Sequence, residues 1–258
     1  MTACDRHALD VTDRDQVLGA VSAVRPAIVV NAAAWTAVDA CEADEARAFH
    51  HNALAVRWLA EGCTRFGAHL VHLSTDYVFN GNLDRPYVEW DDPDPGSVYG
   101  RSKRAGEHEA ITGAPGATVV RTSWVCGWHG NNVVKTILRV AGERTDLAFV
   151  DDQRGRPTFA ADLAPMVRRL GLDRLPGLVH VTNQGAVSWF EFAQAVMAAA
   201  GHDPDRVRPI GTGDIDPPRA AFRPANSVLA NEVLRLSGYA LLDDFHEPLR
   251  RLVAELTA

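Results

Sequence analysis

The sequence predicts an α/β fold in which a doubly wound, mostly parallel sheet is followed by a smaller α+β lobe. Three observations support this prediction. Short apolar runs alternate with amphipathic helical stretches, the runs are continuously apolar, and the pattern changes in the last third of the chain. Strands joined by helices pair in parallel, so their carboxyl ends meet along one edge, where ligands bind in such sheets.

The first two thirds of the chain hold the regular alternation of strands and helices. The expected strands cover residues 27–32, 68–74, 118–122 and 178–181, and the expected helices cover 43–66, 99–111 and 132–141. A polar loop rich in Asp and Pro spans 81–96. The order of these segments fits a sheet with helices on both faces.

The last third has a different composition. Ser188 is a good N-cap for a helix over 189–200, with Glu191 at the third helical position. Further helices are expected over 231–236 and 246–256. We therefore predict a dinucleotide-binding domain over 1–156 and a mainly substrate-binding lobe over 157–258, from which a strand or helix can return to the sheet.

Composition excludes several classes of function. The net charge of −7 argues against nucleic acid as a partner, because phosphate binding needs a basic face. No apolar run approaches the length of a membrane span, and no signal peptide is visible. The four cysteines form no C-x-x-C pair and no zinc-type spacing, so we expect no metal site of this kind and a reducing, cytoplasmic location.

Tyr99 and Lys103 lie four residues apart on an expected helix and therefore share one face of it. Reduction of a carbonyl group needs a proton for the developing alkoxide, and a phenol can donate it. A nearby ammonium stabilises the phenolate and lowers its pKa from about 10. The pair predicts a proton donor with its electrostatic partner, although a solvated helix surface produces the same spacing.

Three strand ends carry further candidates at the same edge of the sheet. Thr75 and Asp76 follow the second strand, where a hydroxyl can align a substrate oxygen or simply form a turn. The alanines at 32–34 follow the first strand and either admit a flat ligand or allow tight packing. Trp124 follows the third strand and can stack on a base or a sugar ring. Because the Tyr/Lys helix falls between the second and third strands, their co-location favours a functional site.

Five segments together carry a resemblance to a known family. They are Asn31–Asp39, Ser74–Phe79, Tyr99–Lys103, Arg121–Val125 and Asp151–Thr158. In order and spacing they resemble the dTDP-4-dehydrorhamnose reductases, an extended branch of the short-chain dehydrogenase/reductases, over nearly the whole chain. The resemblance implies a Rossmann-type sheet, NADPH or NADH as cofactor, and reduction of the C4 keto group of a dTDP-4-keto-6-deoxy sugar. It also allows Mg²⁺ and a homodimer.

The resemblance implies a role for each matching residue. Tyr99 would protonate the C4 oxygen, Lys103 would hold the nicotinamide ribose and lower the pKa of Tyr99, and Thr75 would complete the catalytic triad. The implied cofactor contacts are Asp10, Val11, Ala32, Ala33, Ala34, Tyr99 and Lys103. The implied substrate contacts are Thr75, Asp76, Trp124 and Arg223, with Trp124 packed against the sugar.

The family's glycine-rich turn, G-x-x-G-x-x-G, does not occur in the 258 residues. In the family this turn presents a helix N-terminus to the cofactor pyrophosphate. We expect roughly forty residues of the family pattern to be lacking ahead of Leu9, since a βαβ unit takes about 30 or more. Either the start codon is assigned too late, which we favour, or the chain is an impaired fragment.

Two other functions stay open at this point. A sugar-nucleotide epimerase or dehydratase uses the same triad, although the five segments favour a reductase. A regulatory subunit similar to that of methionine adenosyltransferase would bind a partner enzyme without catalysis. The presence of Tyr99 and Lys103 argues against this second alternative.

Overall fold

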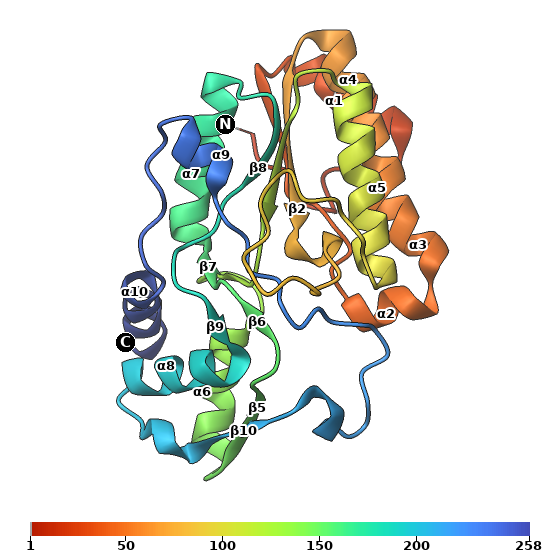
Figure 1. The fold of residues 1–258 in the computed structure, drawn as a ribbon. Helices are drawn as coiled ribbons and strands as arrows, with labels where there is room; N and C mark the ends of the chain where they lie inside the picture. The colour runs from red at the N-terminus through yellow and green to blue at the C-terminus, as the bar shows by residue number, and fades with distance from the viewer. Residues whose placement is uncertain (1) are drawn as a thin grey trace.

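The computed structural model describes residues 2–258, and a four-stranded parallel sheet forms its upper half in Figure 1. The strand order is β1-β2-β3-β8. The strands are β1 (Ile28–Asn31), β2 (His69–Thr75), β3 (Thr118–Thr122) and β8 (Gly177–His180). All neighbours run parallel, and their carboxyl ends lie together, with Thr75 opposite Thr122. The α/β fold with a parallel sheet is confirmed.

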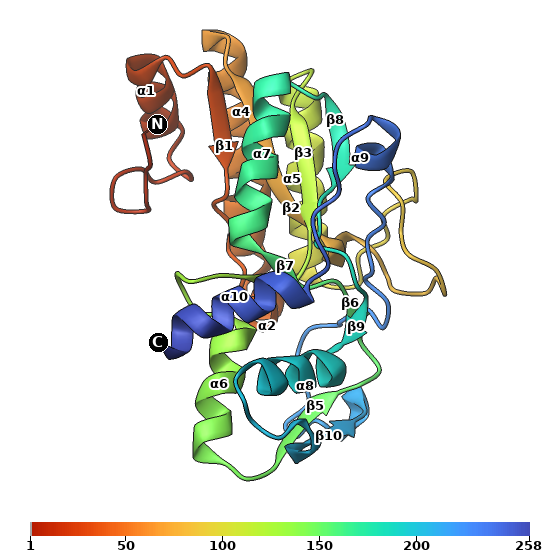
Figure 2. The same cartoon turned by 90° about the vertical axis from the view of Figure 1, so that its left-hand side faces the viewer.

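Helices cover both faces of this sheet, as Figure 2 shows. One face packs against α4 and α5, with α1 beside α4, and the other face packs against α7. The bounds are α1 (Arg14–Val24), α4 (Ala55–Phe66), α5 (Val98–Gly113) and α7 (Ala160–Asp173). Leu70 and Val119 belong to the core under α4, whereas Val71 and Val120 belong to the core under α7. This alternation explains why the strands are apolar throughout.

The helix expected over 43–66 is helical from Glu45 onward but contains a π turn. This helix consists of α3 (Glu45–Phe49), η1 (His50–Leu54) and α4, and a short helix, α2 (Val38–Ala43), precedes it. Asp44 separates α2 from α3, because its carboxylate accepts a hydrogen bond from Arg47 N and caps α3. The π turn places Asn52 at a buried position. Such turns are frequent at functional sites.

The lower lobe in Figure 1 is built mainly from a two-stranded parallel ladder and three helices. They are β5 (Leu147–Val150), β10 (Val207–Ile210), α6 (Val133–Glu143), α8 (Trp189–Ala199) and α10 (His246–Thr257). Ile137, Phe192 and Leu249 belong to the shared core. The capping box predicted for α8 is confirmed, because Ser188 Oγ accepts from Glu191 N while Glu191 Oε2 accepts from Ser188 N.

Short elements complete the chain. They are η2 (Asp76–Val78), β4 (Val125–Cys126), β6 (Arg154–Gly155), β7 (Thr158–Phe159), β9 (Val187–Ser188), η3 (Pro204–Arg206), η4 (Thr212–Asp214) and α9 (Glu232–Leu236). The chain crosses the junction between the sheet and the lobe more than once. Helix α6 and strand β5 precede residue 156 yet lie in the lobe, whereas α7 and β8 follow it and lie on the sheet.

None of the helices in residues 2–258 has the length and apolar character needed to cross a membrane.

Candidate active site

Tyr99 lies in the first turn of α5, close against the turn η2 that follows β2. The helix begins there because Ser97 Oγ accepts a hydrogen bond from Gly100 N at 3.1 Å. A Cβ at Gly100 would lie 2.2 Å from the carbonyl oxygen of Tyr77, so glycine is required for this close packing. The Tyr77 and Tyr99 rings meet edge to face at 5.8 Å. Tyr99 is thereby held beside the end of β2.

Lys103 lies one turn further along α5 and is buried. Its Nζ donates a 2.7 Å hydrogen bond to the carbonyl oxygen of Leu73, two residues before Thr75. Burial lowers the pKa of Lys103 to about 8, and the negative charge of Glu107 partly opposes that shift. The predicted shared face of Tyr99 and Lys103 therefore points toward the carboxyl end of β2.

Thr75 and Asp76 complete this cluster. Thr75 Oγ1 donates to Asp76 Oδ1 at 3.0 Å and accepts from Tyr77 N at 3.2 Å. The Thr75 side chain also lies close enough to the Tyr99 phenol to affect its pKa. Burial raises the pKa of Asp76 to about 6. Asp76 Oδ2 is buried without a hydrogen-bond partner in the described part of the chain, as is Thr122 Oγ1 across the strand pair from Thr75.

The pKa of the Tyr99 phenol is raised, not lowered as expected. Burial is the main cause, the negative charge of Asp76 adds to it, and the Thr75 side chain only partly opposes it. The phenol is consequently protonated at neutral pH, which is the form that donates a proton.

Ala32, Ala33 and Ala34 follow β1 as predicted, and two asparagines hold this turn. Asn31 Oδ1 accepts from Ala33 N at 3.1 Å. Asn52 clasps Trp35, accepting from its N at 2.8 Å and donating to its O at 3.1 Å. Ala32 and Ala33 are exposed and Ala34 is half-buried. Asn52 was not among the predicted site residues, because only the π turn brings its side chain inward.

Asp10 and Val11 lie just before α1. Asp10 is exposed, and its carboxylate accepts hydrogen bonds from Thr12 N at 2.9 Å and Thr12 Oγ1 at 2.7 Å, which lower its pKa. His51 and His50 also contribute to this lowering, so Asp10 lies near the start of the π turn η1. Val11 is half-buried.

Trp124 stacks on another tryptophan. Its ring centroid lies 3.4 Å from that of Trp189, with 6° between the planes. Its backbone has a left-handed φ of 48°, and a Cβ at Gly155 would come within 2.5 Å of its indole. Trp189, which the sequence did not single out, therefore covers one face of Trp124.

Arg223 lies on the segment that returns from the lobe to the sheet. It forms a bidentate ion pair with Asp39 of α2, with Nη2 to Oδ2 at 2.6 Å and Nη1 to Oδ1 at 3.0 Å. The pair lowers the pKa of Asp39 to about 2. Arg219 lies close enough to Arg223 for their charges to repel, and it forms no ion pair within residues 2–258.

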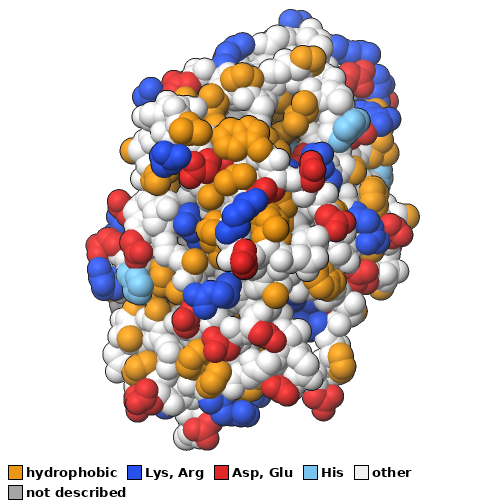
Figure 3. All heavy atoms as spheres, in the orientation of Figure 1, with side chains coloured by type: hydrophobic (Ala, Val, Ile, Leu, Met, Phe, Trp, Pro, Cys, Tyr) orange, Lys and Arg blue, Asp and Glu red, His pale blue; other side chains and the backbone are white. Residues whose placement is uncertain are grey.

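An open pocket of about 780 Å³ extends into the lobe from the tryptophan stack. Its lining includes Phe149, Trp189, Arg208 and Arg219. The face drawn in Figure 3 carries acidic and basic side chains interspersed, with no continuous basic stripe. No group of three or more His, Cys, Asp or Glu side chains in the described chain is arranged to hold a metal ion.

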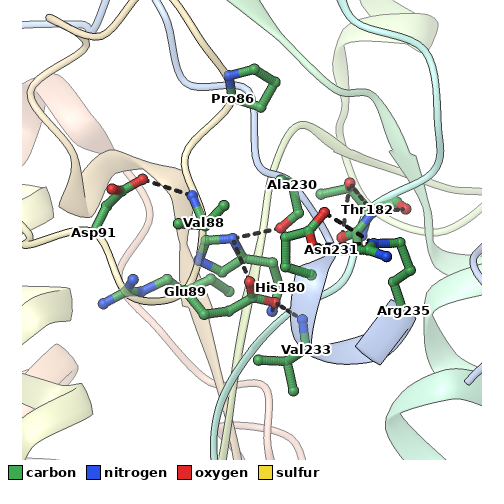
Figure 4. Close-up of polar contacts among 12 residues, drawn as sticks. Pro86, Val88, Glu89, Asp91, His180, Thr182, Ala230, Asn231, Val233 and Arg235 are labelled. Atoms are coloured by element: carbon green, nitrogen blue, oxygen red, sulfur yellow. Dashed lines mark hydrogen bonds and ion pairs between the residues drawn. The ribbon is translucent and has the colours of Figure 1, made fainter. Parts of the chain in front are cut away.

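The loop before α5 is fastened to the C-terminal segment by a buried network, shown in Figure 4. Glu89 Oε1 accepts from His180 N at 3.0 Å and from Val233 N at 3.1 Å. Burial lowers the pKa of His180 to about 3, so its ring is neutral and Nδ1 donates to the carbonyl oxygen of Ala230 at 2.9 Å. The loop that leads to Tyr99 is thus anchored on both β8 and α9.

Comparison with known proteins places the chain among sugar-nucleotide reductases. Residues 1–258 match the model of the RmlD substrate binding domain. A probable dTDP-4,6-dihydroxy-2-methyloxan-3-one 4-ketoreductase of Streptomyces antibioticus is 44% identical, with 100% of this chain and 88% of that protein covered. A dTDP-4-dehydrorhamnose reductase of Streptomyces griseus is 41% identical, covering 100% and 84%.

Solved structures agree with this result. A dTDP-4-dehydrorhamnose reductase from Bacillus anthracis in complex with NADP has a TM-score of 0.94 at 39% identity, over 98% of this chain and 89% of that one. A UDP-glucose 4-epimerase from Thermus thermophilus has a TM-score of 0.80 at 24% identity, which shows the fold alone. The chain belongs to the RmlD family, the family of the dTDP-4-dehydrorhamnose reductases.

Proposed function

We propose that this chain is an NAD(P)H-dependent reductase of the C4 keto group of a dTDP-4-keto-6-deoxy sugar, such as dTDP-4-dehydrorhamnose. The observation that carries the proposal is the meeting of Tyr99, Lys103 and Thr75 at the carboxyl end of β2. Reductases of Streptomyces antibioticus and Streptomyces niveus are 44% and 38% identical to this chain, whereas the epimerase and dehydratase structures are 18–24% identical. The reductase is therefore favoured over the epimerase and the dehydratase, and the buried site of Tyr99 and Lys103 argues against a non-catalytic regulatory subunit.

In this proposal Tyr99 is the proton donor. The protonated phenol lies in a buried site beside Thr75, whose hydroxyl proton would turn from Asp76 to the substrate oxygen and align that oxygen. As the C4 oxygen gains negative charge, it becomes a stronger acceptor, and the proton passes from Tyr99 to it. The ammonium of Lys103, one turn away, stabilises the phenolate that remains.

NADPH or NADH would supply the hydride when bound. The ammonium of Lys103 has three N–H donors and one is used on the Leu73 carbonyl, which leaves two for ribose hydroxyls. The exposed Ala32 and Ala33 leave space beside the end of β1. The residues that would hold the cofactor are Asp10, Val11, Ala32, Ala33, Ala34, Tyr99 and Lys103. A bound NADP in the Bacillus anthracis relative supports NADPH as the first choice.

The substrate would lie between the Tyr99 cluster and the lobe pocket. Asp76 offers an unpartnered carboxylate oxygen to a sugar hydroxyl, and Trp124 offers an aromatic surface to the ring. The diphosphate needs positive charge, which Arg223 and Arg219 would supply. The aromatic lining of Phe149 and Trp189 suits a thymine base.

The cellular location and the oligomeric state also belong to this proposal. All four cysteines are free and three are buried, which supports a reducing, cytoplasmic location. We also propose a homodimer, which light scattering of the purified protein would test. The division at residue 156 stays a prediction, and Mg²⁺ is not part of the proposal.

The test measures NADPH oxidation through the loss of nicotinamide absorbance. The substrate is dTDP-4-dehydrorhamnose, and dTDP-glucose, which lacks the keto group, is the control. We expect turnover only with the keto sugar and a deoxysugar product reduced at C4. Absence of NADPH oxidation by protein that binds NADPH would refute the proposal.

A further inference from the structure

The α5 face of the sheet changes from apolar to charged toward its carboxyl edge. Leu70 and Val119 belong to the apolar core, whereas Ser74 and Arg121 lie directly opposite each other near the ends of β2 and β3. Arg121 is fully buried. A buried charge costs several kcal/mol unless it is paired and hydrogen-bonded. The buried charge of Arg121, close to Thr75, therefore needs a partner.

Glu107 of α5 pairs with this arginine. Its carboxylate is completely buried and accepts from Arg121 Nε at 2.7 Å and from Arg121 Nη2 at 2.8 Å. The same carboxylate accepts from Ser74 Oγ at 2.7 Å and from Arg104 Nη1 at 3.1 Å. Glu107 therefore ties α5, which carries Tyr99 and Lys103, to β2 immediately before Thr75 and to β3.

Glu107 also lies one helical turn from Lys103. Its negative charge raises the pKa of Lys103 against the effect of burial. The other titratable group that faces Lys103 is His72 of β2, whose pKa burial holds well below its usual value, so His72 is neutral. Within the described residues Glu107 is consequently the one counter-charge that acts on Lys103.

We propose that Glu107 is a positioning residue for the reduction, which locks the middle of α5 onto the ends of β2 and β3 and places a negative charge beside Lys103. This inference rests on the proposed roles of Tyr99 and Lys103. A purely structural ion pair would affect folding but would leave the titration of Lys103 unchanged.

The chain offers a direct measurement, because it contains only two lysines, Lys103 and Lys135. We would label the lysine ε-carbons with ¹³C and titrate the cofactor-free enzyme by NMR. Glu107→Gln should lower the midpoint of the Lys103 resonance by about one pH unit, which corresponds to a tenfold change in its acidity. Lys135, in the lobe, should keep its midpoint in both proteins.

Kinetics should follow the titration. In Glu107→Gln, kcat at pH 8 should fall by about tenfold, and the alkaline limb of the pH profile should move to lower pH together with the Lys103 midpoint. The matched control is Glu109→Gln on the same helix, which removes a surface pair with Arg57 (2.6 and 2.7 Å) and should change neither quantity. A folded Glu107→Gln enzyme with the wild-type Lys103 midpoint and alkaline limb overturns the inference.

A second variant decides the matter if Glu107→Gln does not fold. Glu107→Asp keeps the charge but withdraws the carboxylate by one methylene, so kcat should fall several-fold while the Lys103 midpoint stays near the wild-type value. An unchanged kcat in Glu107→Asp overturns the inference. Tyr99→Phe distinguishes failure of the proposed function from failure of the proposed role of Glu107. Full activity of that variant refutes the proposed function, whereas an inactive Tyr99→Phe beside a wild-type Glu107→Gln refutes only the role of Glu107.

Discussion

The ammonium of Lys103 donates a 2.7 Å hydrogen bond to the carbonyl oxygen of Leu73, and this contact joins helix α5 to strand β2 at the proposed site. Because the acceptor belongs to the backbone, the position of Lys103 depends on the sheet and not on a mobile side chain. Two ammonium donors remain for a ligand. The contact therefore fixes the position of Lys103 and leaves these two donors for the ribose hydroxyls that we propose it binds.

Lys103→Ala should weaken both steps that the lysine is proposed to serve. Loss of charge-assisted hydrogen bonds of about 1.5–3 kcal/mol predicts a rise in the Kd for NADPH of about tenfold or more. Turnover should fall as well, because the phenolate of Tyr99 loses its neighbouring charge. Cofactor fluorescence and steady-state kinetics measure the two effects, with Lys135→Ala as control. An unchanged Kd would exclude Lys103 from the cofactor site.

Tyr99→Phe should remove the proton donor while leaving the packing of the ring against Tyr77 in place. General acid catalysis contributes about 10²–10⁴-fold, so we expect a loss of that size in kcat with an NADPH Kd within about twofold of the wild type. Tyr239→Phe is the matched control, because it removes one hydroxyl that contacts Asp173 on the surface of α7. Normal turnover in Tyr99→Phe would show that another group donates the proton.

Gly155→Ala should disturb the Trp124 side of the site. The added methyl group would lie 2.5 Å from the indole, so the tryptophan stack must shift at a cost of about 1–3 kcal/mol in the free energy of unfolding. We also expect a higher KM for the sugar nucleotide. Gly142→Ala in α6, where a Cβ meets open space, should instead stabilise the protein by about 0.5–1 kcal/mol. Urea unfolding and kinetics compare the two variants, and equal stability would contradict the packing.

The residues of the cluster at β2 could be predicted because they follow from local rules. Helical spacing places Tyr99 and Lys103 on one face, and the carboxyl edge of a parallel sheet gathers the residue that follows each strand. Thr75 is found by the second rule alone. These rules need only the order of the elements, which the apolar runs indicate.

The supporting residues could not be predicted, because their roles depend on contacts between distant segments. Asn52 reaches Trp35 and Ser102 only through the π turn. Trp189 meets Trp124 only once the lobe has folded back on the junction. The expected lowering of the Tyr99 pKa was also wrong, because spacing says nothing about burial, which is the main influence on this pKa. Strands β5 and β10 have four residues each and carry weak periodicity.

Arg223→Gln should affect binding of the substrate more than its reduction. The arginine is proposed to meet the diphosphate and lies on a different segment from Tyr99, so KM should rise about tenfold while kcat changes by less than about threefold. Asp39→Asn keeps the cation and should raise KM less. Arg139→Gln, which breaks an exposed pair with Glu143, serves as control. A large fall in kcat with constant KM in Arg223→Gln would contradict a binding role.

His180→Gln should make stability less dependent on pH. Burial holds the pKa of His180 near 3 in the folded protein, against about 6.5 in the unfolded chain. Between these values the unfolded state binds the extra proton, so this group's stabilising effect is complete above pH 6.5 and is lost as the pH falls toward 3.

Glutamine cannot titrate, yet its amide can still donate to the Ala230 carbonyl. The slope of the unfolding free energy between about pH 5.5 and 6.5 should therefore decrease by up to about 1.4 kcal/mol per pH unit. The raised pKa of Glu89 has the opposite effect on stability, but Glu89 is present in both proteins, so the comparison of wild type with His180→Gln isolates the effect of His180. An equal slope in wild type and His180→Gln would show that His180 is not held neutral by the fold.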